Sequence, residues 1–261
     1  MTDQSSHNAR VREEFARQAE NLSKAAVFNN ETVLARMREA AAIDASTRVL
    51  DVACGPGIVA AALAPGAKEV VGCDLTPEML AKARERCAKA GLANVRFEPG
   101  TVERLPFKDG EFDVVVSRSA VHHFLAPATA FREMARVLRP GGRMVTVDVA
   151  SSEVAEEAAL HNALESLRDP SHARMLPKSE LHAHLKSAGL AIEEAKTWAN
   201  HREFEEWVGI TAVPERAAPL RVVMTELARA GLGAGTGLRL EEGKLRFEHH
   251  AWLTLAIKRA R

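Results

Sequence analysis

The 261-residue sequence contains no tyrosine, and aromatic residues make up only 5% of it. The absence of tyrosine excludes the Tyr-Lys catalytic pair of short-chain dehydrogenases. The three cysteines, Cys54, Cys73 and Cys87, are odd in number and form no C-x-x-C pair, which argues against a disulfide framework and a zinc ribbon. We therefore expect reduced thiols and no metal site, with a thiol site at Cys54 and Cys73 as the less favoured alternative.

Charge and hydropathy also exclude several classes of protein. The 35 basic residues are balanced by 35 acidic ones, so no basic field exists to collect nucleic acid or an anionic membrane. No apolar run approaches the roughly twenty residues that span a bilayer, and the polar start of the sequence lacks the apolar region of a signal peptide. We expect a single cytoplasmic domain that binds a small-molecule substrate, either as a monomer or as a homodimer.

A glycine-rich turn marks the most informative segment. Residues 48–52 form a short apolar run typical of a buried parallel strand, and residues 58–64 begin a helix. Between them, Gly55 and Gly57 allow backbone to approach a ligand closely at the helix N-terminus. Asp74 ends the next apolar run, where it can accept hydrogen bonds from ribose hydroxyls. The pattern predicts a nucleotide-cofactor site.

Two cofactors fit this site. The spacing Gly55-x-Gly57-x-x-Ala60 satisfies the loose dinucleotide pattern, so an NAD-dependent oxidoreductase is one interpretation. Against it stand Asp51, which lies on the strand just before the turn, the helical sequence that precedes the strand, and the missing tyrosine. The stretch Asp51-x-Ala53-x-Gly55-x-Gly57 resembles motif I of the class I S-adenosylmethionine (SAM)-dependent methyltransferases.

Further segments carry the same resemblance in the same order, over roughly residues 46–150. They are residues 70–80, 98–107, 112–124 and 137–143, similar to the family's second strand, adenine loop, fourth strand and the turn into the fifth. The detail is closest to the branch of the ubiquinone/menaquinone biosynthesis methyltransferases. The resemblance implies a Rossmann-like α/β fold with a mostly parallel seven-stranded sheet, an antiparallel last strand between the fifth and sixth strands, and helices on both faces.

The resemblance also implies which residues surround SAM. Asp74 would bind the ribose, Thr101 stands where many relatives carry an aspartate for the adenine amino group, and Asp51 orders the loop or approaches the cationic tail. The full cofactor set is Asp51, Ala53, Gly55, Gly57, Asp74, Leu75, Met79, Thr101, Val102, Glu103 and Ser117.

The rest of the chain is expected to form a lid and a substrate cap. Apolar residues at helical spacing predict two N-terminal helices, so that residues 1–45 form a helical lid or simply pack on the core. Residues 46–150 form the SAM-binding core, 151–189 a substrate-cap insertion, and 190–261 the C-terminal strands and helices. Phe28, Arg168 and His172 are the candidate substrate contacts. The alternative for residues 168–172 is a polar turn.

His122 and His123 are the catalytic candidates, because they follow the fourth strand where methyltransferases present side chains to the transferring methyl. An imidazole can accept a proton from a phenol, enol or amine at neutral pH. We predict that His123 matters more for turnover, and a structural or orienting histidine is the alternative. The predicted activity is methyl transfer from SAM to an O, N or C atom of a small molecule; the alternatives are C-methylation of a quinol and SAM binding without transfer.

Overall fold

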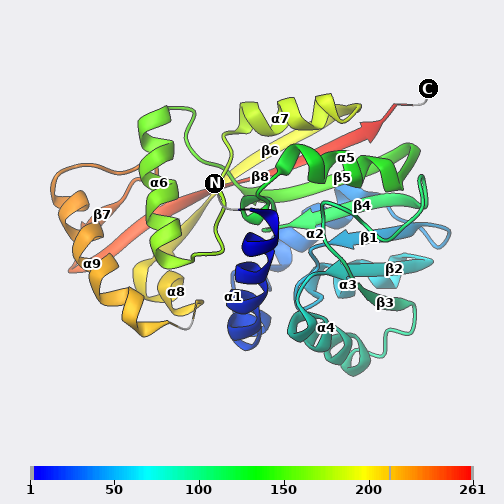
Figure 1. Ribbon diagram of the computed structural model, residues 1–261, viewed down its shortest axis with the longest axis horizontal. Helices are drawn as coiled ribbons and strands as arrows, with labels where there is room; N and C mark the ends of the chain where they lie inside the picture. Colours follow the sequence, from blue (N-terminus) through cyan, green and yellow to red (C-terminus); the bar gives the residue numbers. More distant parts are fainter. Residues whose placement is uncertain (1–2, 212, 260–261) are drawn as a thin grey trace.

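The computed structural model describes residues 3–211 and 213–259, and at its centre lies an eight-stranded mixed sheet (Figure 1). Seven strands follow the order β3-β2-β1-β4-β5-β8-β6, and β7 pairs with β8 alone. Strands β1 to β5 are parallel, and β8 runs antiparallel to both β5 and β6, as the sequence predicts. The strands are β1 (Arg48–Val52), β2 (Glu69–Asp74), β3 (Val95–Pro99), β4 (Phe112–Arg118), β5 (Leu138–Val149), β6 (Leu190–Glu203), β7 (Arg239–Glu241) and β8 (Lys244–Lys258).

Helices cover both faces of the sheet and extend past one end of it (Figure 1). None of the described helices is long and apolar enough to cross a bilayer. The α-helices are α1 (Gln4–Lys24), α2 (Glu31–Ala41), α3 (Ile58–Leu63), α4 (Pro77–Lys89), α5 (Pro127–Val137), α6 (Ala155–Arg168), α7 (Lys178–Ser187), α8 (Phe204–Gly209) and α9 (Pro214–Arg229).

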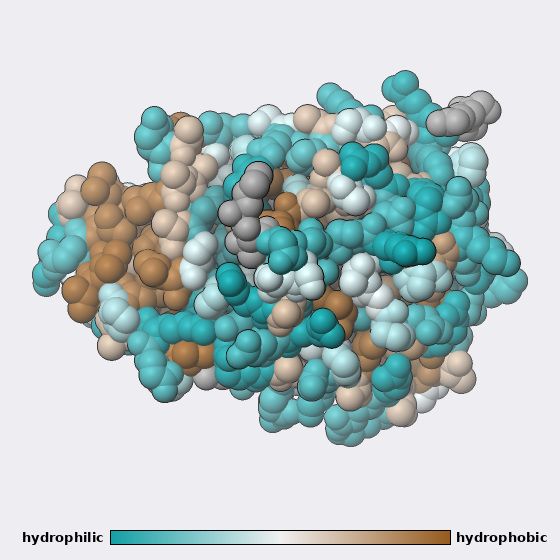
Figure 2. Space-filling model, in the orientation of Figure 1, coloured by the Kyte–Doolittle hydropathy of each residue, from teal (hydrophilic) through white to brown (hydrophobic). Residues whose placement is uncertain are grey.

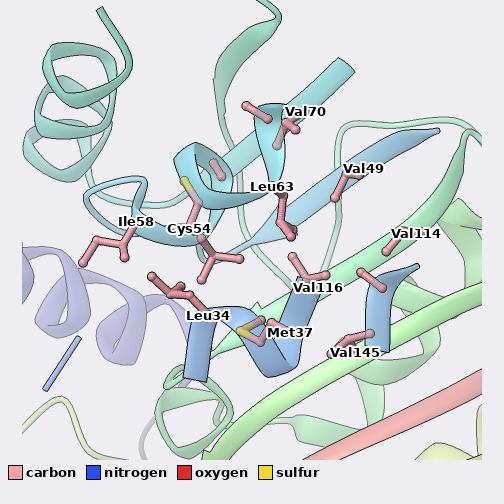
Figure 3. Packing of buried hydrophobic residues seen from close by; sticks show 14 of the residues in the cluster. Leu34, Met37, Val49, Cys54, Ile58, Leu63, Val70, Val114, Val116 and Val145 are labelled. Atoms are coloured by element: carbon pink, nitrogen blue, oxygen red, sulfur yellow. The ribbon is translucent and has the colours of Figure 1, made fainter. Parts of the chain in front are cut away.

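Successive residues of the parallel strands belong to two different cores. Val49 and Val114 pack with α2, α3 and α4 on one face, in the cluster that Figure 3 shows. Their neighbours Leu50 and Val115 pack with α5 and α7 on the other face. Because both faces are covered, the strands consist of nearly continuous apolar residues, which is why they could be recognised in the sequence.

A third apolar cluster builds the cap. Strands β6 and β8 continue beyond the parallel strands as a long ribbon, on which α6, α8 and α9 gather around Trp207 and Phe247. Helix α7, by contrast, packs on the sheet beside α5. The cap is therefore assembled from α6 and from residues after 203, whereas the sequence division places all of 151–189 in it.

Two connecting segments are fixed by local chemistry. Helix α5 begins at Pro127, because proline is well suited to the first helical turn. The glycine-rich residues 231–237 pack against the cap: Ala234 and Thr236 are buried, and the Thr236 carbonyl accepts a hydrogen bond from the Glu248 amide at 2.8 Å.

The outer surface of the cap is unusually apolar. Figure 2 shows hydrophobic residues gathered at the end of the molecule formed by α6, α9 and β7. Leu167 of α6, Val222 of α9 and Leu232, which follows α9, are each more than half exposed. A contiguous patch of this kind is typical of a surface that contacts another molecule.

The packing of the glycine turn gives a first testable prediction. Gly57 begins α3 with φ +74°, and a Cβ at this position would lie 2.8 Å from the Ala83 Cβ of α4. Gly57→Ala should therefore lower the free energy of unfolding by about 2–4 kcal/mol, through backbone strain plus overpacking. Chemical denaturation measures the loss.

Gly91→Ala is the matched control for this substitution. Gly91 also has a positive φ, +66°, but nothing lies within 4 Å of the Cβ that alanine would add. Only the backbone strain of about 1–2 kcal/mol should appear. Equal losses in the two variants would show that contact between α3 and α4 does not require glycine at residue 57.

Candidate active site

A cavity of about 230 Å³ lies at the carboxyl ends of β1, β2 and β4. This is the edge at which open α/β sheets bind ligands. One part of the cavity is formed by the glycine turn, and the other part by α1, α6, β6 and β8. Helix α1 contributes Val11, Phe15 and Leu22, so the N-terminal helix covers the cavity.

The structure brings most of the sequence-predicted site residues to this cavity. Gly57, Ser117 and His172 are not among its lining residues. Gly57 faces α4, and Ser117 is buried within β4 opposite Thr146 of β5. The predicted residues that line the cavity are Phe28, Asp51, Ala53, Gly55, Asp74, Leu75, Met79, Thr101, Val102, Glu103, His122, His123 and Arg168.

Asp74 holds the glycine turn against the end of β2. Its Oδ2 accepts the Gly55 amide at 2.8 Å, and its Oδ1 accepts the Thr76 amide at 2.9 Å. Burial raises the pKa of this carboxyl, while the amide donors act in the opposite direction. Asp74 also lines the cavity, so the carboxyl that holds the turn borders the space for a ligand.

Asp51 is a buried carboxyl without a full set of partners. Only 1% of the residue is exposed, and its Oδ2 has no hydrogen-bond partner within the described chain. Burial raises the pKa of Asp51 to about 8, and the nearby charge of Asp74 adds to this effect. A positively charged ligand group beside Oδ2 would remove the penalty of burying the ionised carboxylate.

Arg118 is a cavity residue that the sequence analysis missed. It ends β4 and donates hydrogen bonds to the carbonyls of Phe28 and Val27, at 2.8 and 3.1 Å, so both contacts go to backbone rather than to a carboxylate. Burial lowers the pKa of its guanidinium to about 10. Its place in the chain, directly after Ser117 in a recognised motif, was the available signal.

The adenine-loop residues contact the N-terminal helix. Thr101 and Arg104 form an isolated bridge that shapes the loop, and the Glu103 Oε1 accepts a hydrogen bond from Gln4 Nε2 at 2.9 Å. Glu103 therefore joins the loop to the start of α1. Met79 packs with Ala19 and Leu22 of the same helix. These contacts place α1 against the loop.

His122 is held by a buried carboxylate. Its Nδ1 lies 2.5 Å from Asp148 Oδ1, and Asp148 also accepts the backbone amides of Ala120 and Val121. Burial disfavours a charged imidazole, but the charge and hydrogen bond of Asp148 outweigh it, so the pKa of His122 is raised. Asp148 was not among the predicted site residues, since it lies on β5 and shares no local motif with His122.

His123 lies in a different environment. Its Nδ1 donates to the Ser171 carbonyl at 3.0 Å, and its own carbonyl accepts a hydrogen bond from His7 Nε2 at 2.7 Å. The ring meets Phe15 edge to face, with 4.8 Å between centroids. Burial and the neighbouring His122 lower the pKa of His123 to about 4. The residue thus connects η2 (Val121–His123) to α1 and to the loop after α6.

The loop at residues 168–172 is fixed by its own contacts. Arg168 pairs with Glu165 at 2.9 Å and lies over the Trp207 ring, and Asp169 accepts Gln18 Nε2 at 3.0 Å. His172 donates to Asn162 Oδ1 at 2.8 Å. The loop therefore borders the cavity through Arg168 and Asp169, while His172 is held behind it.

Comparison with known proteins identifies the family to which the chain belongs. The profile of a family described as "Methyltransferase domain" matches residues 50–146. The "Uncharacterized methyltransferase YcgJ" of Bacillus subtilis is 37% identical over 194 residues, which cover 74% of this chain and 77% of the relative. The chain belongs to the SAM-dependent methyltransferase family. The crystal structure of YcgJ superimposes with a TM-score of 0.83, at 32% identity over 89% of this chain and all of that one.

Relatives whose names state a reaction match a smaller part of this chain. A demethylmenaquinone methyltransferase from Thermus thermophilus is 45% identical over 107 residues, which cover 40% of this chain and 48% of the relative. The [4+2]-cyclase SpnF shares the fold, with a TM-score of 0.60 at 21% identity. The fold thus hosts more than one reaction, and the acceptor must be inferred from the site itself.

The residues of the cavity fit SAM. The unpartnered Asp51 Oδ2 suits the ammonium group of its amino-acid tail, and the Arg118 guanidinium suits the carboxylate. A Cβ at Gly55 would meet nothing within 4 Å, so backbone there is open toward the cavity. The thiols of Cys54 and Cys73 are buried, and burial raises the pKa of both, which makes them unreactive neighbours of the cofactor site.

Asp51 gives a second testable prediction. Its folded-state pKa of about 8 lies above its unfolded value, so without cofactor its contribution to stability is complete below about pH 4 and is lost as the pH rises through 8. Asp51→Asn, which cannot ionise, should therefore be more stable than wild type by about 1–3 kcal/mol above pH 8.5. Near pH 4 the two proteins should be equally stable.

Denaturant unfolding of both proteins at pH 4, 6 and 8.5 measures this difference. Other titrating groups are common to both proteins and cancel in the comparison. A stability difference that does not change with pH would contradict the assignment of a raised pKa to Asp51.

Proposed function

We propose that this methyltransferase acts on a small molecule whose accepting atom loses an acidic proton, such as a phenolic or enolic hydroxyl. The observation that carries the proposal is the His122–Asp148 pair, which lines the same cavity as the cofactor residues Asp51 and Asp74. A histidine oriented by a buried carboxylate is an arrangement well suited to general-base catalysis.

Binding and alignment come first. SAM supplies a methyl group on a positively charged sulfur, which is already a good leaving group. Asp74 would hold the ribose hydroxyls, Thr101 and Val102 would border the adenine, and Asp51 and Arg118 would bind the two charges of the tail. The protein's main contribution is then to orient the acceptor in line with the methyl group and to exclude water.

His122 would remove the acceptor's proton. Because its Nδ1 proton is donated to Asp148, the lone pair of neutral His122 is on Nε2. When Nε2 takes up a proton, the imidazolium is stabilised by the adjacent carboxylate. Asp148 is itself kept ionised, since the charge and hydrogen bond of His122 outweigh its burial and lower its pKa.

This assignment favours His122 over His123, which the sequence analysis preferred. The low pKa of His123 makes it a weak proton acceptor, and its Nδ1 is occupied by the Ser171 carbonyl. We therefore assign His123 to shaping the cavity between α1 and the 168–172 loop. Its T-shaped contact with Phe15 supports this role.

The proposal yields a prediction for the cofactor half. Asp74→Ala should weaken SAM binding by about 1.5–3 kcal/mol, because a charged acceptor for the ribose is lost and the Gly55 amide loses its partner. Calorimetry with SAM and S-adenosylhomocysteine should show similar losses, since the ribose is common to both. Thermal-shift assays with NAD should show no stabilisation of the wild type. Stabilisation by NAD alone would instead identify an oxidoreductase.

A second prediction concerns the base. His122→Ala should lower kcat by about 10²- to 10⁴-fold with little change in SAM affinity, and His123→Ala should cost far less. In the wild type, kcat should rise with pH through the raised pKa of His122, because the base must be unprotonated. Asp148→Asn should shift that rise to lower pH while reducing the maximum rate. Wild-type rates from His122→Ala would exclude the base.

Incubating a metabolite extract with isotopically labelled SAM identifies the acceptor. A labelled O-methyl ether supports the proposed reaction directly. A label on a ring carbon of a quinol would point to the C-methylation that the demethylmenaquinone relatives suggest. If SAM binds but no compound in the extract becomes labelled, the protein binds SAM without transferring its methyl group.

A further inference from the structure

A second group of ionisable side chains borders the cavity on its cap side. His161 and Glu165 are one helical turn apart on α6, and His249 projects from β8 toward them. All three residues are at most 5% exposed. Glu165 and His249 also line the cavity that contains His122. The residues come from distant parts of the chain and form no sequence motif. The sequence analysis accordingly expected no metal site.

The three side chains converge on a small volume. His249 Nε2 lies 3.0 Å from Glu165 Oε1, and His161 Nε2 lies 3.9 Å from the same oxygen. The three ligand atoms are all within 4.8 Å of one another. Two ligands about 2.1 Å from a tetrahedral metal ion are roughly 3.4 Å apart. The three separations, from 3.0 Å to at most 4.8 Å, bracket this value, so side-chain shifts of about 1 Å would let the cluster surround one ion.

The Nε2 atoms of the two imidazoles are not satisfied by hydrogen bonds. Within the described chain, neither His161 Nε2 nor His249 Nε2 has a hydrogen-bond partner of acceptable geometry, although both atoms are buried. The short distance from His249 to Glu165 is therefore not matched by alignment of the ring with the oxygen. Ligands that share a metal point at a common centre rather than at each other. Buried unpaired ring nitrogens are costly unless something else binds them.

Glu165 can serve as a metal ligand and keep its present partner. Its Oε2 pairs with Arg168 at 2.9 Å, which leaves Oε1 facing the two histidines, with Trp207 Nε1 donating to it at 3.2 Å. The Arg168 guanidinium beside Oε2 favours the ionised carboxylate, which is the form that a metal ligand must have.

One contact must change when an ion binds. Arg202 Nη1 lies 3.3 Å from His249 Nδ1, and a guanidinium can only donate, so this contact needs a lone pair on Nδ1. A neutral imidazole that binds a metal through Nε2 carries its proton on Nδ1 instead. Arg202 would then release His249 while keeping its two bonds to Glu206.

We propose that His161, Glu165 and His249 bind one divalent transition-metal ion, of the zinc, cobalt or iron(II) class, in the cap-side wall of the acceptor cavity. Two imidazoles and one carboxylate match the preferences of these ions better than those of magnesium or calcium. Three protein ligands leave at least one coordination position open, and Glu165 and His249 direct it toward the cavity. The ion would there hold an oxygen atom of the acceptor.

The test measures metal binding without cofactor or acceptor, so its outcome is independent of the proposed methyl transfer. The chelator-treated full chain is titrated with Co²⁺, whose visible absorption reports its ligands, and Zn²⁺ is then added as a competitor. We expect one Co²⁺ per chain, displaced by Zn²⁺. His161→Ala should weaken Co²⁺ binding at least 100-fold, whereas His201→Ala, which removes an imidazole with 78% of its side chain exposed, should not change it.

A third variant tests the competition with Arg202. Arg202→Gln replaces an obligatory donor by a side chain whose carbonyl can accept the Nδ1 proton of a metal-bound His249. It should tighten Co²⁺ binding about 10-fold, as expected when an outer partner orients a ligand histidine. Circular dichroism checks that each variant is folded. If His161→Ala does not fold, the Co²⁺ stoichiometry of the wild type and the Co²⁺ affinity of Arg202→Gln still test the proposal.

Two results would overturn the proposal. The first is wild-type protein that takes up no stoichiometric Co²⁺. The second is binding that His161→Ala retains, or that His201→Ala removes, because the ion would then be on the surface. In either case the three residues form a buried ion network that only stabilises the cap.

Discussion

The buried carboxylate of Asp148 is the interaction on which the active site depends. It accepts backbone amides from Ala120 and Val121 and the Nδ1 proton of His122, so one side chain on β5 fixes the turn that follows β4. Without it, that turn would bury unpaired amides, and the imidazole would lose both its orientation and its raised pKa. The cost of burying Asp148 is offset only because all these donors converge on it.

On the cofactor side, too, one buried carboxylate both holds a turn and borders the cavity. Asp74 closes the glycine turn by accepting the amides of Gly55 and Thr76, and the same carboxylate faces the cavity. The Asp51 Oδ2 has no hydrogen-bond partner in the described chain, and the buried Arg118 guanidinium contacts the backbone carbonyls of Phe28 and Val27 rather than a carboxylate. A zwitterionic tail brings an ammonium group that favours the ionised form of Asp51 and a carboxylate that can pair with Arg118, which is the physical reason the cavity favours SAM.

The parts of the fold that follow from local patterns could be predicted from the sequence. The parallel strands are apolar because both faces are covered, and the glycine turn and the acid at Asp74 have fixed spacing within one β-α-β unit. Asp148 and Arg118 could not be predicted as site residues from such local patterns. Their importance arises from contacts with η2 and with residues 27–28, and strand periodicity carries no information about such partners.

The cap shows more clearly what local sequence patterns cannot predict. Its core joins α6 to α8, α9 and the first residues of β8. The sequence segments that build it are therefore interrupted by α7, which packs on the sheet. His161 and Glu165 are recognisable as one helical face, but His249 reaches them only through the β8 register. Long-range pairing decides which ionisable residues meet, and a single sequence does not encode that pairing in any local signal.

A crystal structure of the full chain with bound SAM tests the central claim most directly, because that claim is a statement about where the reactive methyl lies. The account predicts that the ribose hydroxyls contact Asp74, the amino-acid tail lies between Asp51 and Arg118, and the sulfonium methyl points into the part of the cavity bordered by His122 Nε2. A methyl group that faces away from His122, toward the glycine turn or solvent, would contradict the account.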